Sequence, residues 1–218
     1  MVLTLYKLDA SPPARAVMMT IEALGIQDVE YVDVNLLTKD HLTEEYLKMN
    51  PQHTIPMLKD DDFIIWDSHA ITAYLVGKYA ENNALYPTDL KKRALIDQRL
   101  HFDSGILFPA LRGNVEPVLF KGESSFKPEG LEKISVAYDF TDKFLASLSP
   151  YLAGSDLTLA DICCVATISS LNALVPIDDN KYPNLAAWLE RCSTEEFYKK
   201  ANEAGAQLLG QIVKSKLA

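Results

Sequence analysis

Ser11 is the first residue whose position suggests chemistry, in the stretch SPPAR (11–15) between an apolar strand and a helix. Proline is favoured at the first helical position, because the N–H there has no partner within the helix. If Ser11 is the N-cap, Pro12 and Pro13 offer it no N–H, so its oxygen can accept only from Ala14. The hydroxyl proton then stays free to hold an anion, particularly a thiolate, at the positive end of the helix. The alternative is an ordinary N-cap serine.

The stretch NPQHTIP (50–56) places a proline where a second strand begins. Proline is tolerated in a sheet only at a strand start or an edge. A cis bond between Ile55 and Pro56 would leave the Ile55 backbone exposed for pairing with an extended peptide. The alternative is a trans proline at a strand start.

The stretch WDSHAI (66–71) places Asp67 and Ser68 at the start of another helix. Free N–H groups and a hydroxyl at a helix start can bind a carboxylate, and Asp67 can bind an ammonium group. The alternative is a pair of residues that only cap the helix.

Three of the four histidines, His41, His53 and His69, lie in or beside these loops. Their spacing is not that of metal ligands on one helix, so we predict no metal site. A histidine can still donate to an anionic ligand. The loops together predict a pocket for an extended, anionic tripeptide that carries a thiol. The thiol would face Ser11, and the two ends would meet Asp67 and the histidines.

Hydrophobic periodicity predicts the elements that must position these residues. Residues 2–8 and 29–36 favour strands around a helix at 15–24, which Gly25 ends. A short helix at 43–49 precedes a hairpin that turns at 60–62, and a helix follows at 68–79. This order is βαβ and then ββα. From residue 91 only helices are expected, at about 91–118, 129–147, 158–173, 183–191 and 195–203, with a less regular one to 214. We therefore predict an α/β domain (1–81), a linker (82–90) and an all-helical domain (91–218).

Composition limits which binding partners and which cellular compartment we expect. The chain has 218 residues and a formal net charge of −9, which disfavours nucleic acid and anionic membranes as partners. Cys163, Cys164 and Cys192 do not form a disulfide framework and are interpreted as buried thiols. The sequence offers neither a signal peptide nor a membrane span, so we expect a cytoplasmic protein.

These motifs, in this order, resemble the cytosolic glutathione S-transferases. The serine at the helix entry and NPQHTIP are similar to the insect delta and epsilon classes, and DSHAI resembles epsilon more, because delta members usually carry Arg where His69 stands. The stretch LAGSDLTLADICCVATISSL (152–171) is similar to the helix entry of the family's second domain. Thr158 and Asp161 there have the spacing of a structural capping box.

The resemblance implies a thioredoxin-like first domain, glutathione as cosubstrate, no other cofactor, and a homodimer. It implies that Ser11 stabilises the glutathione thiolate, which attacks an electrophilic carbon. The rest of the implied glutathione site falls into three groups. His41 and His53 would meet the glycyl carboxylate, Thr54, Ile55 and cis Pro56 the cysteinyl segment, and Asp67, Ser68 and His69 the γ-glutamyl end.

The second substrate is expected between the domains, along GILFPALRG (105–113). Pro109 should bend the helix, and the i, i+3 and i+4 spacing of Phe108, Leu111 and Arg112 puts them on one face. With Phe120 closing the pocket, an apolar wall with one cation would suit bulky hydrophobic electrophiles. Alternatively, Phe108 and Leu111 are inter-domain core, and Arg112 is a salt-bridged surface residue.

Other functions on this scaffold stay open at this point. A thioredoxin-type redox enzyme needs a cysteine at the helix entry, where this chain has Ser11 and Ala14. A non-catalytic carrier of hydrophobic ligands is the alternative to catalysis. From the class alone we expect detoxification of xenobiotics, including insecticides, with dehydrochlorination or hydroperoxide reduction as side activities. A specialised member acting on one lipid or hormone would share the mechanism.

Overall fold

The N-terminal part of the chain builds a four-stranded sheet in the order β2-β1-β3-β4. The computed structural model describes residues 3–148 and 150–218, so Val2 of the predicted first strand lies outside the described residues. Strand β1 (Leu3–Lys7) runs parallel to β2 (Val29–Asp33) and antiparallel to β3 (Met57–Asp60), which forms a hairpin with β4 (Phe63–Trp66). The predicted order of strands and helices is confirmed.

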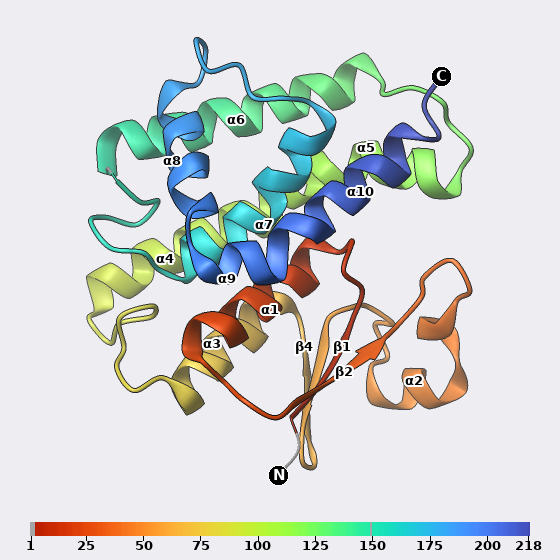
Figure 1. Ribbon diagram of the computed structural model, residues 1–218, viewed down its shortest axis with the longest axis vertical. Coiled ribbons are helices and arrows are strands. Elements are labelled where there is room, and N and C mark those ends of the chain that lie inside the picture. Colours follow the sequence, from red (N-terminus) through yellow and green to blue (C-terminus); the bar gives the residue numbers. More distant parts are fainter. Residues whose placement is uncertain (1–2, 149) are drawn as a thin grey trace.

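Helices cover both faces of this sheet (Figure 1). Helices α1 (Pro12–Leu24) and α3 (Ser68–Tyr79) bury their apolar sides against Leu3, Leu5 and Leu58. On the other face, α2 (Glu44–Met49) packs Tyr46 against a smaller apolar cluster, and the short turn η1 (Asp40–Leu42) precedes it. Helix α1 begins at Pro12 rather than at residue 15, and β2 ends at Asp33 rather than at residue 36.

The rest of the chain is helical, as predicted. Its elements are α4 (Leu90–Phe102), α5 (Phe108–Phe120), α6 (Pro128–Leu148), α7 (Leu159–Leu174), α8 (Pro183–Ser193), α9 (Glu196–Tyr198) and α10 (Ala204–Lys214). The described residues after 91 contain no strand, only an isolated bridge between Tyr151 and Gly154. None of the described helices is both long and apolar enough to cross a membrane.

The helix expected over 91–118 is interrupted, which corrects that prediction. A π-helical turn, η2 (Asp103–Leu107), separates α4 from α5, and a second one, η3 (Lys199–Glu203), separates α9 from α10. Pro109 is the second residue after η2 and has no N–H to donate to the carbonyl four residues earlier. The interruption therefore lies next to the residue that was expected to bend the helix.

Helix α7 lies at the centre of the helical part and also contacts α1 of the sheet domain (Figure 1). Nearly all of its residues are buried. Cys163 and Cys164 of α7 and Cys192 of α8 are free thiols in this core, and burial raises the pKa of each. They are therefore inert core residues, as the sequence indicated.

The start of α7 is held by Asp161, which is fully buried. Its carboxylate accepts from the N–H of Thr158 at 2.9 Å, the N–H of Leu152 at 2.8 Å and the indole N–H of Trp188 at 3.0 Å. Burial raises the pKa of Asp161, although these donors oppose the rise. The capping role predicted for Thr158 and Asp161 is confirmed, and the same carboxylate also ties α8 and the preceding loop to α7.

Replacing Asp161 with Ala should therefore destabilise the protein strongly, because four buried donors, the Thr158 hydroxyl among them, lose their acceptor. We expect the free energy of unfolding to fall by about 3–5 kcal/mol, measured by urea denaturation. Asp156→Ala, at an exposed position of the same loop, is the matched control and should change stability by less than about 0.5 kcal/mol. Equal effects of the two substitutions would contradict this role of Asp161.

Candidate functional site

The directions of the strands bring the predicted site residues to one edge of the sheet. Tyr6 near the end of β1 pairs with Met57 at the start of β3, and Met57 pairs with Trp66 at the end of β4. The loop from β1 to α1, the turn before β3 and the start of α3 must therefore lie side by side. Residues far apart in sequence, Ser11, Pro56 and Asp67, share this edge.

Ser11 is the N-cap of α1 and has an extended backbone with φ −84° and ψ 116°. Its N–H donates to the carbonyl of Leu8 at 2.8 Å, and its carbonyl accepts from the N–H of Arg15 at 3.0 Å. Its side chain makes no capping hydrogen bond, as the two prolines predicted. The backbone of Ser11 is thus fixed at both ends while its partly exposed hydroxyl remains available to a ligand.

The loop before β3 is fixed by Asn50 and Tyr46. The carbonyl of Thr54 accepts from the Tyr46 hydroxyl at 2.7 Å and from the Asn50 side-chain amide at 2.9 Å. The peptide bond between Ile55 and Pro56 is cis, as predicted. Among the described residues, neither the N–H nor the carbonyl of Ile55 takes part in a hydrogen bond. An extended peptide could therefore pair with this residue.

Asp67 adopts a left-handed backbone with φ 76° and caps α3. One of its carboxylate oxygens accepts from the N–H groups of His69 at 3.0 Å and Ala70 at 3.1 Å. The capping interpretation of Asp67 is thus confirmed, and its second oxygen, on an exposed residue, makes no hydrogen bond with the described residues. Ser68 is half-buried beside it at the first helical position.

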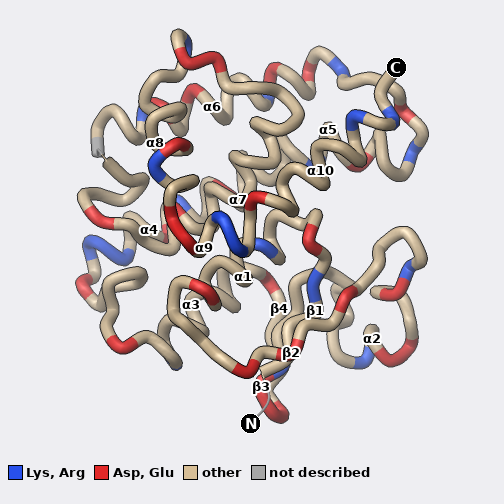
Figure 2. The backbone as a smooth tube through the Cα atoms, viewed as in Figure 1, with Lys and Arg blue, Asp and Glu red and all other residues tan. Residues whose placement is uncertain are grey.

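His41 and His53 lie together, with ring centroids 6.0 Å apart, although twelve residues separate them. Partial burial and the neighbouring His53 lower the pKa of His41, and Asp40 opposes this effect. The Nδ1 atom of His41 is buried and makes no hydrogen bond with the described residues. Acidic residues are spread over both parts of the molecule (Figure 2), so this pair of rings is a group that could donate to an anionic ligand in an otherwise acidic protein.

His69 contacts the helical part of the molecule. Its Nε2 atom lies 3.0 Å from a carboxylate oxygen of Asp103 in η2, and both side chains are largely buried. Burial alone lowers the pKa of His69, but the hydrogen bond and the charge of Asp103 outweigh it, so the pKa is raised. The pair therefore ties the start of α3 to the turn from which α5 emerges.

The structure does not bring together all of the residues predicted for the second substrate. An open hollow of about 470 Å³ is lined by Phe108, Arg112, Glu116, Lys121 and their neighbours on α5 and η2. All of the residues that line it belong to the helical part, so this hollow does not lie between the two domains, where the site was expected. Leu111 is only 2 % exposed and belongs to the helical core, which corrects its assignment as a lining residue. The hollow is not lined by Phe120, which is 53 % exposed at the end of α5.

Helix geometry explains this division. Phe108, Leu111 and Arg112 do share a broad face, but consecutive residues of a helix are about 100° apart. The boundary of the core passes between Leu111 and Arg112, so one points inward and the other outward. Arg112 is paired with Glu116 at 2.9 Å, which matches the alternative of a salt-bridged surface residue.

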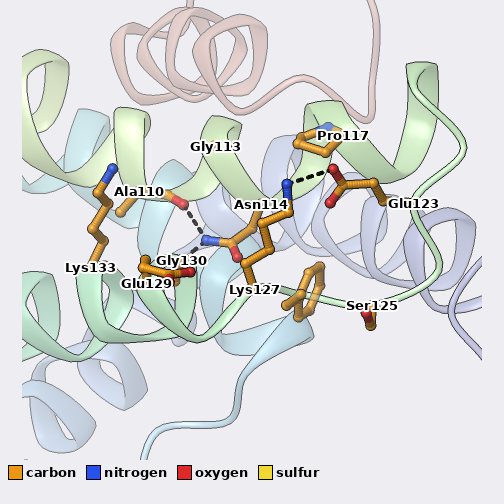
Figure 3. Close-up of a pocket in the computed structure, with 11 residues that line it drawn as sticks. Ala110, Gly113, Asn114, Pro117, Glu123, Ser125, Lys127, Glu129, Gly130 and Lys133 are labelled. Carbon is orange, nitrogen blue, oxygen red and sulfur yellow. Dashed lines mark hydrogen bonds and ion pairs between the residues drawn. The ribbon is translucent and has the colours of Figure 1, made fainter.

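A second hollow, of about 160 Å³, lies between α5 and α6 (Figure 3). The buried side chain of Asn114 joins the two helices there by donating to the carbonyls of Ala110 and Gly130. Lys127 and Glu123 form an ion pair at its rim. None of the residues predicted for the site lines this hollow.

Sequence reasoning missed Asp103, which lies 34 residues from its partner His69. An acidic residue inside a polar helix carries no local signal of such a contact. It also gave no role to Arg15, which the structure buries completely.

Comparison with known proteins agrees with this geometry. Residues 5–83 match the family model described as "Glutathione S-transferase, N-terminal domain", and residues 95–196 match "Glutathione S-transferase, C-terminal domain". The chain is 66 % identical to glutathione S-transferase 1 of Manduca sexta, over the full length of both chains.

Two solved structures are similar to this one throughout. An epsilon-class glutathione S-transferase of the housefly, Musca domestica, superposes with a TM-score of 0.95 at 47 % identity, over 98 % of each chain. A glutathione transferase homologue from Drosophila mojavensis with bound glutathione gives the same TM-score and identity, over 99 % of this chain and 98 % of that one.

The pair of His69 and Asp103 makes a prediction for pH dependence. Because the folded-state pKa of His69 is raised, its stabilising contribution is complete below the unfolded value of about 6.5 and is lost as pH rises through the raised value. Asp103→Asn should lower the imidazole pKa of His69, measured by NMR titration. It should also cost about 1.5–3 kcal/mol of stability at pH 5.5 and less at pH 8.5. A loss of stability that does not vary with pH would contradict the ion pair.

Proposed function

The chain belongs to the glutathione S-transferase family and is a glutathione transferase, and from that premise we propose that the Ser11 hydroxyl stabilises the thiolate of bound glutathione. The observation that carries this proposal is the Ser11 hydroxyl at the start of α1, which makes no hydrogen bond with the described residues while its backbone is fixed on both sides. The burial of all three cysteine thiols, and a serine rather than a cysteine at the entry to α1, argue against a thioredoxin-type redox role.

The chemistry needs a thiolate, because the thiolate and not the thiol is the nucleophile. A free cysteine thiol has a pKa of about 8.5 and is mostly protonated at neutral pH. One charge-assisted hydrogen bond of about 1.5–3 kcal/mol lowers that pKa by about one or two units. The thiol proton leaves to solvent, the sulfur lone pair forms a bond to the electrophilic carbon, and the leaving group departs with its bonding electrons.

The remaining loops supply a binding mode for an extended tripeptide. In this proposal His41 and His53 donate to the glycyl carboxylate, and the Ile55 backbone pairs with the cysteinyl residue beside Thr54 and Pro56. What supports this is the adjacency of the two histidine rings and the unpaired backbone of Ile55.

The opposite end of the tripeptide would meet the start of α3. The Asp67 carboxylate oxygen that is not used in capping binds the γ-glutamyl ammonium group. Ser68 and the N–H groups at the start of α3 bind the carboxylate of the same γ-glutamyl residue. The Nε2 atom of His69 is engaged by Asp103, so His69 contributes through its position at the helix start.

The second substrate in this proposal is a hydrophobic electrophile bound against Phe108, with Arg112 near the developing negative charge. The open hollow on α5 supports it. Detoxification of xenobiotics such as insecticides is the proposed biological use, with dehydrochlorination and hydroperoxide reduction as side activities of the same thiolate. Failure to conjugate any of a panel of aryl halides and chlorinated insecticides would contradict this assignment.

We also propose that the enzyme is a cytoplasmic homodimer and needs no cofactor besides glutathione as cosubstrate. Its negative charge favours neither nucleic acid nor anionic membranes as partners. Sedimentation equilibrium that gives a mass near 24 kDa at micromolar concentration would contradict the dimer.

Ser11→Ala should leave the fold and the affinity for glutathione nearly unchanged. The pKa of the bound thiol should rise by about one or two units, and conjugation at neutral pH should fall about ten- to hundredfold. Ultraviolet absorbance of the thiolate against pH measures the pKa directly. Ser193→Ala, at a half-buried serine that ends α8, is the control and should change neither quantity.

Two other outcomes would overturn the proposal. A glutathione thiol that binds the wild-type protein with an unshifted pKa would favour the carrier function over catalysis. A lowered pKa that Ser11→Ala does not change would assign the stabilisation to another group.

A further inference from the structure

Arg15 is a buried cation one helical turn after Ser11, and the proposed reaction leaves it without a role. Its side chain is 0 % exposed. Its Nη2 atom donates to the carbonyl of Ala166 at 3.1 Å and to the hydroxyl of Ser170, both on α7. Its Nε and Nη1 atoms are buried and have no hydrogen-bond partner among the described residues.

The positive charge of Arg15 forms no ion pair with the described residues, although the Asp9 carboxylate is near enough to favour it. Within the described part of the chain, no acidic oxygen lies within ion-pair distance of its guanidinium. Asp9, the acidic residue before Ser11 in the same loop, is paired with Lys7 at 2.7 Å instead. Lys7 itself has two carboxylate partners, Asp9 and Asp33, so its charge is balanced where that of Arg15 is not.

The Arg15 side chain lies beneath the loop that carries Ser11. A methyl group added at Gly205 would meet the Asp9 carbonyl oxygen at 2.2 Å and the Cδ atom of Arg15 at 2.6 Å, so the stem of Arg15 is close to the backbone of that loop. Four residues of helix separate Ser11 and Arg15 by about 6 Å along the axis. Side chains of a helix also tilt toward its N-terminus.

We propose that Arg15 is a positioning residue for catalysis, whose buried charge lowers the pKa of the glutathione thiol held by Ser11 without touching the tripeptide. The inference rests on the proposed role of Ser11. A charge in a buried, poorly screened site acts over a longer range than one at the surface. Its field adds to that of the α1 N-terminus, and the contacts with Ala166 and Ser170 hold it in place against α7.

The charge persists at the pH where the enzyme works. Burial lowers the pKa of Arg15 to about 9, while Tyr198 and Asp9 oppose the fall. The guanidinium is therefore still protonated at neutral pH. At an effective dielectric constant of about 20, a unit charge changes the pKa of a thiol about 10 Å away from it by about one unit.

The sharpest test neutralises the charge and keeps Arg15. Ser170→Asp places a carboxylate where the Ser170 hydroxyl contacts the guanidinium, and Ser170→Asn supplies a side chain of the same shape without charge. We expect Ser170→Asp to raise the pKa of the bound thiol by about half a unit to one unit. Ser170→Asn should leave that pKa within about 0.2 units of wild type. Both are read from thiolate absorbance against pH.

A second pair of variants changes Arg15 itself. Arg15→Met removes the charge and should raise the thiol pKa by a similar amount, whereas Arg15→Lys keeps a cation and should retain most of the lowering. Circular dichroism and the dissociation constant of glutathione identify which variants are folded and can bind.

The outcomes separate this inference from the role of Ser11. A wild-type thiol pKa equal to that of free glutathione would overturn the proposed function itself. A lowered wild-type pKa that is unchanged in folded Ser170→Asp, or in folded Arg15→Met, would overturn only the role of Arg15 and leave it a structural link to α7.

Discussion

The site depends on one hydroxyl at the start of a helix, which has no partner in the described part of the chain. Pro12 and Pro13 begin α1 without an N–H that could occupy the Ser11 oxygen, and the Leu8 carbonyl and the Arg15 N–H fix the Ser11 backbone. A hydroxyl that makes no capping bond weakens the helix start slightly, and this small cost leaves a rigid donor facing a ligand. The strand register then decides which other loops share that edge of the sheet.

The helical part packs against α1 and holds the start of that helix, with Ser11, in place. Helix α7 packs directly against α1, and its own start is fixed by the buried carboxylate of Asp161. The contact between His69 and Asp103 joins the same two parts at α3. The contact of α7 with α1 and the contact of Asp103 with His69 both hold helices that carry site residues. The geometry of the glutathione site and the position of α5 therefore depend on one shared core.

Local patterns in the sequence were sufficient to predict much of the fold and several features of the candidate site. The cap residues Ser11 and Asp67, the proline at 56 and the capping box at 158–161 each follow from chemistry within a few residues, and each was confirmed. Contacts between residues far apart in the sequence, such as His69 and Asp103, could not be predicted. The sequence also did not predict which residues of α5 face the core, because the boundary of the core passes between the consecutive residues Leu111 and Arg112. Arg15 was missed because a charged residue type gives no hint of complete burial.

The most direct test of the central claim is a crystal structure of this protein with bound glutathione. We predict the sulfur within hydrogen-bond distance of the Ser11 hydroxyl, the glycyl end beside His41 and His53, and the γ-glutamyl end at the start of α3. A sulfur that contacts a different side chain while Ser11 stays unpaired would contradict the account.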